Sequence, residues 1–324
     1  MKTIDLKYLW FIASFLLTVS AVQANEGSEL KNKAAALRHY YYTGGTHNNK
    51  GCTPPNKCLY KRTAGQPSDP SFPIYWISEW TMYRVFNNYD KFPPPYALPP
   101  TGLTQADYEV SYGKTYFDST YKPTDGDGNG AMMEHYEKRC LPIFPMKNDF
   151  TCSFVSLGNK AYFLRYQDRP AGTPKCCQFS LDNHPPRTDF IKHLPYNKEQ
   201  STHLGGTIQA YSMEVGPQKI LFGYSFEATP TPDIYDKTAA PYRHPQSFFF
   251  SGYPLTPPDA PIVSQNYTHF RMQRPDPHQT WDQVAQMCPA DPEWCCLFTS
   301  DCPDKKDGVL NASKTAPEWS TLNQ

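Results

Sequence analysis

Aromatic and polar residues alternate along several stretches of the chain, and this pattern predicts strands. From 107 to 117 every second position is apolar or aromatic, with a single lysine in the series: Tyr108, Val110, Tyr112, Lys114 and Tyr116. A period of two is typical of an antiparallel strand with one buried face. We therefore expect the face that carries Tyr112 and Tyr116 to turn towards the core.

Two pairs of segments have the form of β-hairpins. Segments 152–157 and 160–166 are joined by a Gly-Asn dipeptide, a two-residue connection that suits a primed turn. Segments 207–215 and 219–228 form the second pair, and its return segment has the clearest aromatic stripe of the chain: Ile220, Phe222, Tyr224 and Phe226. Further strands are predicted at 79–87, 132–140, 176–180, 247–252 and 262–272.

Together these segments predict an all-β fold with few short helices. Consecutive hairpins favour one antiparallel meander, and a twisted sheet of about ten strands rarely stays flat. We expect a strongly curved, half-barrel-like, disulfide-bonded sheet whose concave face could hold an apolar ligand. One helix is predicted at 280–287, where Thr280 and Gln283 have the spacing of a capping box.

The composition narrows the classes of function. The 324 residues include 31 Lys and Arg against 31 Asp and Glu, so the formal net charge is zero. A protein that binds nucleic acid needs a basic surface to displace counterions, and we expect no such partner here. Aromatic residues make up 15% of the chain, which is enough for an extensive core and argues against disorder.

The first 24 residues have the pattern of a secretory signal peptide. Lys2 and Lys7 precede an apolar run at 9–19, and small or apolar residues follow at Val22 and Ala24. The run is shorter than the ~20 residues that span a bilayer, so we expect no transmembrane anchor. The protein is predicted to be secreted, or to reside in the lumen of the secretory pathway.

Beyond this leader (1–24), the chain is predicted to divide into three parts. Residues 25–75 form a weakly ordered N-terminal arm, residues 76–302 the curved-sheet domain, and residues 303–324 a polar tail. The sequence leaves open whether the arm is a propeptide that is removed.

Ten cysteines are expected to form disulfides, because an even count in an oxidising compartment favours disulfides over free thiols or zinc. They are Cys52, Cys58, Cys140, Cys152, Cys176, Cys177, Cys288, Cys295, Cys296 and Cys302. Neighbouring residues of a strand point to opposite faces, so the members of each adjacent pair should bond different, distant partners. The connectivity stays open.

Glycosylation and calcium binding are two further predictions. Sequons at Asn266 and Asn311 suit a secreted glycoprotein. Oxygen ligands alternate with glycines, as at the start of a calcium loop, at Asp125, Asp127 and Asn129. The twelfth position of this loop is Tyr136 where a Glu is needed, and the same run also suits a tight turn.

No residue is assigned a catalytic role. The nearest match to a nucleophile elbow, at 223–227, has Glu227 in place of the final glycine and lies within a predicted strand. The histidines lack the spacing of familiar zinc sites. A hydrolase with two carboxylates assembled in space stays an alternative, because such a pair has no spacing signature.

Several short motifs follow one another in a characteristic order between about 105 and 290. They are Gly113-Lys114-Thr115-Tyr116-Phe117-Asp118, Cys140, Cys152, Cys176-Cys177-Gln178-Phe179, Phe222-Gly223-Tyr224, Pro245-Gln246-Ser247-Phe248-Phe249-Phe250, Asn266-Tyr267-Thr268-His269-Phe270 and Cys288. In this order the chain resembles ependymin-related proteins and their relatives, the bacterial lipoprotein-localisation carriers. The resemblance implies a deeply curved antiparallel sheet with an apolar pocket, disulfides, secretion, N-glycosylation and, in some members, calcium binding. It implies no catalytic residue.

The leading hypothesis is a secreted glycoprotein that holds a lipid or other hydrophobic ligand in the concave face, with one polar end fixed by a tyrosine hydroxyl. The residues expected to line the site are Tyr112, Tyr116, Phe222, Tyr224 and Phe226. In the competing interpretation these side chains pack against one another and leave no cavity. The alternative function is an extracellular matrix or adhesion protein that binds calcium weakly.

Overall fold

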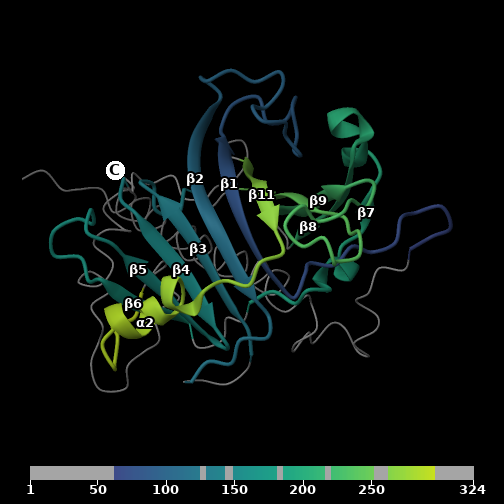
Figure 1. Ribbon diagram of the computed structural model, residues 1–324. Helices are drawn as coiled ribbons and strands as arrows, with labels where there is room; N and C mark the ends of the chain where they lie inside the picture. Colours follow the sequence, from purple (N-terminus) through teal and green to yellow (C-terminus); the bar gives the residue numbers. More distant parts are fainter. Residues whose placement is uncertain are drawn as a thin grey trace, which may run out of the picture.

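The strands of the described residues form a single antiparallel sheet, which has 11 strands (Figure 1). The computed structural model describes residues 62–124, 129–142, 149–180, 185–215, 220–251 and 262–295. The strands are β1 (Tyr75–Val85), β2 (Tyr108–Asp118), β3 (Ala131–Glu137), β4 (Cys152–Leu157), β5 (Lys160–Arg165), β6 (Cys176–Ser180), β7 (Tyr196–Asn197), β8 (Ile208–Val215), β9 (Ile220–Glu227), β10 (Pro245–Ser251) and β11 (Ile262–Arg271). The short helices are η2 (Phe190–His193), η3 (Gln200–Gly206), η4 (Pro277–Gln279) and α2 (Asp282–Met287).

Two meanders make up the sheet. Strands β1 to β6 pair in succession, strands β7 to β11 do the same, and the pairing of β1 with β11 joins the two halves. Strands β6 and β7 follow each other in the chain but form opposite edges of the sheet. The connection between them must therefore run from one edge to the other.

One face of the sheet encloses the main core. Phe163 of β5 and Tyr211 of β8 belong to the same buried cluster, although seven strands separate β5 from β8 in the sheet order. A single buried cluster that extends over so many strands indicates that the sheet curves strongly around it. The predicted all-β, curved antiparallel meander is confirmed, and the enclosed face is its concave face.

The hairpin signals located most of the strands. Strand β6 spans the predicted range, and the turn between β4 and β5 has Gly158 at a φ of +53°, which suits a primed turn. Strand β7 has two residues and was not predicted, because a segment this short has no period to detect.

Helix α2 packs on the convex face, in front of β4 to β6 in Figure 1. Its buried side chains, Trp281 at the start and Val284, lie in a second cluster with Met133 and Val155. The helix is confirmed, but the predicted capping box is wrong. The hydroxyl of Thr280 donates instead to the backbone oxygen of Asp276, at 2.7 Å.

Disulfides fix the edge of the sheet at β6. Cys176 bonds Cys288 and Cys177 bonds Cys295, so the adjacent cysteines take different, distant partners, as predicted. Cys176 lies in the convex cluster and Cys177 in the concave core. The two bonds therefore attach the C-terminal segment to both faces of the sheet.

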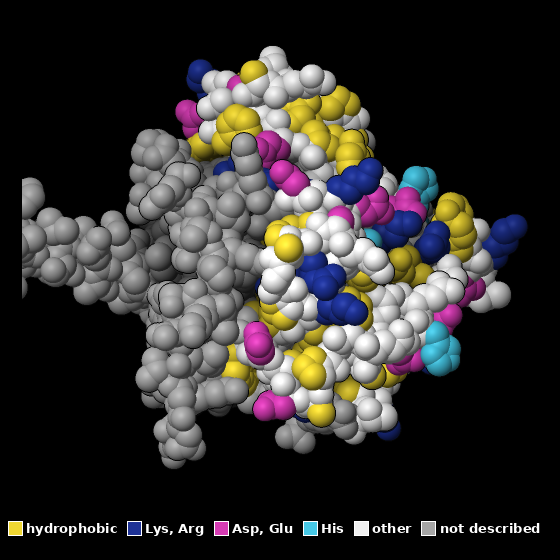
Figure 2. All heavy atoms as spheres, turned by 90° about the vertical axis from the view of Figure 1, so that its left-hand side faces the viewer, with side chains coloured by type: hydrophobic (Ala, Val, Ile, Leu, Met, Phe, Trp, Pro, Cys, Tyr) yellow, Lys and Arg dark blue, Asp and Glu magenta, His cyan; other side chains and the backbone are white. Residues whose placement is uncertain are grey.

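The C-terminal segment also covers the outer edge of β6. The backbone amide of Cys295 donates to the backbone oxygen of Gln178, and the backbone amide of Gln178 donates to the backbone oxygen of Glu293. Figure 2 views this side of the molecule, where basic and acidic side chains are interspersed over the described surface. A third disulfide, Cys140–Cys152, joins the segment that follows β3 to the first residue of β4. The remaining predicted disulfide cysteines lie outside the described residues: Cys52, Cys58, Cys296 and Cys302.

Among the described helices, none combines the length and apolar character that crossing a bilayer requires.

Candidate functional site

Aromatic rings line the concave face over the β8 to β10 half of the sheet. Phe222, Tyr224 and Phe226 alternate along β9 and are almost completely buried. Tyr224 stacks on Phe248 of β10 with ring centroids 4.8 Å apart, and Tyr211 of β8 meets Phe226 edge-on. Pairs of this geometry stabilise a core beyond the area they bury. This half of the face is therefore lined by closely packed aromatic rings.

A segment of the chain itself lies on these rings. Residues 62–74, which we call the strap, precede β1 and place Phe72 in the concave core. The Phe72 ring lies 5.4 Å from that of Phe226 and 5.8 Å from that of Tyr224. This part of the predicted N-terminal arm is thus packed against the sheet.

The connection from β6 to β7 covers the same face. Its described part, residues 185–195, contains η2 and buries Phe190, Ile191 and Leu194 in the concave core. The Phe190 ring stacks on Phe72 at 5.7 Å, and the backbone amide of Phe72 donates to Thr188 at 2.8 Å. The strap and this crossover segment therefore form one cover, which follows from placing β6 and β7 at opposite edges.

The space left under the cover is small. A cavity of about 10 Å³ lies between the strap, the crossover segment and the sheet, bordered by Phe72, Trp76, Phe117, Met132, Pro186, Arg187, Phe190, Tyr224 and Tyr267. This volume holds about one water molecule. Among the described residues that border this cavity, a hydrophobic ligand finds room only if the cover moves, so the competing interpretation of mutual packing describes this part of the concave face.

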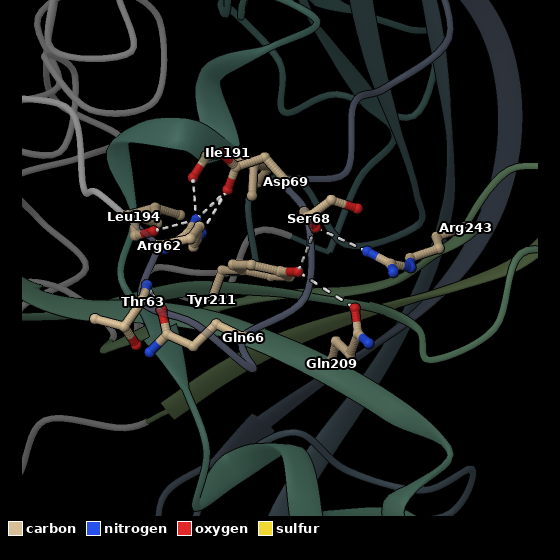
Figure 3. Close-up of polar contacts among 10 residues, drawn as sticks. All are labelled: Arg62, Thr63, Gln66, Ser68, Asp69, Ile191, Leu194, Gln209, Tyr211 and Arg243. Atoms are coloured by element: carbon tan, nitrogen blue, oxygen red, sulfur yellow. Dashed lines mark hydrogen bonds and ion pairs between the residues drawn. The ribbon is translucent and has the colours of Figure 1, made fainter.

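Polar contacts attach the strap at its N-terminal end, as Figure 3 shows. The guanidinium of Arg62 pairs with Asp69 within the strap and donates to the backbone oxygen of Leu194, at 2.8 Å. The same cation lies 5.0 Å above the ring of Tyr211. The strap is thus fixed to both the crossover segment and the sheet by non-covalent contacts.

A backbone carbonyl of the strap binds two donors at the mouth of the concave face. The oxygen of Ser68 accepts from Arg243 Nη1 at 2.8 Å and from the Tyr211 hydroxyl at 3.2 Å (Figure 3). Burial raises the pKa of Tyr211 to about 12, so its hydroxyl keeps its proton at neutral pH. Arg243 and Tyr211 together make a binding place for an acceptor atom next to the apolar core.

Polar groups also reach the floor of the concave face. The indole nitrogen of Trp80 donates to Thr115 Oγ1 at 3.1 Å, and the Tyr136 hydroxyl donates to Glu134 at 3.0 Å. Burial raises the pKa of Tyr267 well above its ordinary value, and the charge of Glu134 adds to this effect. The polar groups of Trp80 and Tyr136 on the floor are therefore satisfied by hydrogen bonds within the sheet.

The predicted lining residues fall on two faces. Phe222, Tyr224 and Phe226 lie on the concave face, as expected. Tyr112 is 56% exposed, and Tyr116 packs against the convex cluster beneath α2. The expectation that these two tyrosines line the hollow is wrong.

Gly113 explains why β2 turns its aromatic face outward. A Cβ atom at Gly113 would lie 2.3 Å from the Trp80 ring and 2.1 Å from the backbone oxygen of His135. Only the face with small residues, Ser111, Gly113 and Thr115, leaves room for Trp80 inside the curve. The alternation along β2 is as predicted, but which of its two faces turns inward depends on Trp80, a residue of another strand.

The predicted glycosylation site at Asn266 does not fit the structure. Asn266 lies within β11 and is 3% exposed. Its amide nitrogen, the atom that would carry a glycan, donates to the backbone oxygen of Tyr96. Its amide oxygen accepts from Ser264 at 2.7 Å. Asn311 lies outside the described residues.

The calcium prediction falls mostly outside the described residues. Asp125 and Asp127 are not described, and Asn129 is exposed at the start of the next described range. No cluster of metal-ligating side chains occurs in the part of the chain that the structure describes.

Most buried carboxylates in the described ranges stabilise turns. Asp107 accepts from Thr104, and Asp118 accepts from Thr120. Asp233 is 2% exposed and accepts from the backbone amides of Tyr235, Asp236 and Met272. Carboxylates that are saturated in this way give no support to the hydrolase alternative.

Three residues of this candidate site were missed in the sequence. Phe72 and Arg243 lie outside the predicted strands, and Phe190 lies in a connection. The apolar residues Phe190, Ile191 and Leu194 were an available signal, because a connection without a buried role has little need of them.

Comparison with known proteins adds no family to this description. No protein-family model matches the chain, and no curated protein matches it significantly in sequence.

Proposed function

We propose that this is a secreted protein that binds a lipid or other hydrophobic ligand in the concave face of its curved sheet, after the strap has moved away. The single observation that carries the proposal is Phe72, a ring from outside the sheet that occupies the aromatic face of β9. The three disulfides are compatible with an extracellular location.

Energy considerations support an exchange between the strap and a ligand. Burying a phenylalanine side chain contributes about 1.5–3 kcal/mol, and each CH₂ of an alkyl chain contributes about 0.8 kcal/mol. An alkyl chain of several carbons can therefore replace the contacts that Phe72 makes with Tyr224 and Phe226. The floor of the face, hydrogen-bonded through Trp80 and Thr115, would stay in place during the exchange.

The test compares two phenylalanine variants of the full chain with a neutral probe, dodecan-1-ol, by native mass spectrometry and calorimetry. Phe72→Ala removes the competing ring, so the affinity for the probe should rise by about tenfold or more. Phe86→Ala is the matched control, because Phe86 is 37% exposed and lies outside the concave core. Folded wild type and Phe72→Ala proteins that both fail to bind the probe would contradict the proposal.

A further inference from the structure

The two donors that bind Ser68 point to the chemistry of a ligand. Arg243 and Tyr211 bind the strap through one neutral carbonyl oxygen, next to the apolar face where Phe72 lies. Within the described residues, the Nε–H of Arg243 is buried and has no hydrogen-bond partner. The strap therefore uses only part of the donor capacity of this cation, and a carbonyl is a weaker acceptor for a guanidinium than a carboxylate is.

The strap has the form of an amphiphile. Its Ser68 carbonyl binds at the polar mouth, and its Phe72 ring lies in the apolar interior. We infer that the ligand is a long-chain carboxylate, whose head replaces the Ser68 carbonyl between Arg243 and Tyr211 and whose chain replaces the Phe72 ring. This inference rests on the proposed function and adds the class of ligand and the residues that recognise its head.

A second arginine near the cavity is a poorer candidate for the head. Arg187 borders the cavity, but both oxygens of the Asp189 carboxylate bind it, through Nε and Nη2 at 2.9 Å each. A ligand would have to displace a charged acceptor from Arg187 but only a neutral carbonyl from Arg243. Displacing the Ser68 carbonyl from Arg243 costs less free energy than displacing the Asp189 carboxylate from Arg187, because charged acceptors form the stronger hydrogen bonds.

The test uses two probes of equal chain length, dodecanoate and dodecan-1-ol, with calorimetry on the full chain. Wild type should bind dodecanoate about tenfold or more tightly than dodecan-1-ol, because a charged hydrogen bond is added. Arg243→Gln should reduce this preference to about twofold or less, and Tyr211→Phe should reduce it by a smaller factor. Arg187→Gln, the matched control, should leave it unchanged.

Arg243→Lys retains a cation and should keep part of the preference, which separates recognition of the head from a folding defect. Equal affinities of wild type for the two probes would overturn the inference and leave the proposed function intact. A preference that survives in Arg243→Gln, or disappears in Arg187→Gln, would also overturn it. If neither wild type nor Phe72→Ala binds either probe, the inference and the proposed function both fail.

Discussion

The two halves of the sheet are closed by different means. At the β6 edge, disulfides from Cys176 and Cys177 hold the C-terminal segment, and α2 covers the convex face. Over β8 to β10, the concave face is covered by the strap and η2, which are attached by hydrogen bonds, ion pairs and ring contacts. The described residues of this second half contain no disulfide.

We call the disulfide-bonded end of the sheet at β6 the scaffold, in contrast to the cover formed by the strap and the crossover segment. Covalent bonds that close loops of more than a hundred residues restrict the unfolded chain and leave the folded edge fixed. Non-covalent contacts at a surface can open locally without unfolding the sheet. We therefore propose that the cover over β9, and not the disulfide-bonded end, exchanges with a ligand.

Breaking the disulfide-bonded end should have the largest effect on stability. The Cys176–Cys288 bond closes a loop with a sequence separation of 112 residues. Replacing both cysteines by alanine should lower the free energy of unfolding by about 4 kcal/mol, because the unfolded chain gains freedom. Urea denaturation measures this. A loss no greater than that of a strap variant would contradict the division into scaffold and cover.

Phe72→Ala should have the next largest effect. Truncation of a buried ring costs about 3 kcal/mol in unfolding free energy, while the exposed control Phe86→Ala should stay within about 0.5 kcal/mol. A ligand should distinguish Phe72→Ala further from Phe86→Ala, because dodecan-1-ol should restore part of the stability that Phe72→Ala has lost. Thermal denaturation with and without dodecan-1-ol measures both effects. Absence of any restoration would argue against exchange between ring and ligand.

Asp233 fixes the loop that carries Arg243. Replacing Asp233 should lower the free energy of unfolding by less than Phe72→Ala does. Burial alone would raise the pKa of Asp233, but backbone amides and the Tyr242 hydroxyl lower it below its ordinary value. Asp233→Asn should lower the free energy of unfolding by about 2 kcal/mol, because Met272 and Tyr242 lose their acceptor.

The pH dependence of Asp233 has a definite sign. A carboxyl with a lowered pKa stabilises the fold when ionised, so its contribution is present at neutral pH and is lost as the pH falls below about 4. Urea denaturation at pH 7 and pH 3 should show a larger difference between wild type and Asp233→Asn at pH 7. Equal differences at the two pH values would contradict this account.

His135 lies in the half of the sheet that ends at the disulfide-bonded edge. Replacing it should change the stability of the protein least. Its Nδ1 lies 2.9 Å from Ser153 Oγ, which contacts Tyr166, whose hydroxyl donates to Gln283 of α2. Burial lowers the pKa of His135 despite the opposing charge of Glu137.

The unfolded chain therefore takes up a proton at His135 before the folded chain does, and stability should fall as the pH drops below about 6.5. Thermal denaturation between pH 7.5 and pH 5 should show a smaller decline in His135→Asn than in wild type. An identical pH dependence in the two proteins would contradict this assignment.

The sequence predicted those parts of the fold that depend on local pattern. The alternation along β9 and the Gly-Asn turn after β4 located strands, and the Cys176-Cys177 doublet predicted divergent disulfides. These features are properties of neighbouring residues, which a period of two or a turn signal reports directly.

Features that depend on distant partners could not be predicted in this way. Tyr112 points outward because Trp80, in another strand, needs the space beside Gly113. Asn266 has a complete sequon, yet Tyr96, 170 positions away, binds its amide. The placement of Phe72 on β9 depends on the closure of the whole sheet, which no local pattern reports.

Hydrogen–deuterium exchange of the full chain, with and without saturating dodecanoate, tests the displacement of the strap most directly. The amide of Phe72 is protected by its bond to Thr188, whereas β8 and β9 are protected within the sheet. We predict that dodecanoate accelerates exchange across 62–74 and leaves the amides of β8 and β9 protected. Bound dodecanoate with unchanged exchange in 62–74 would contradict the account.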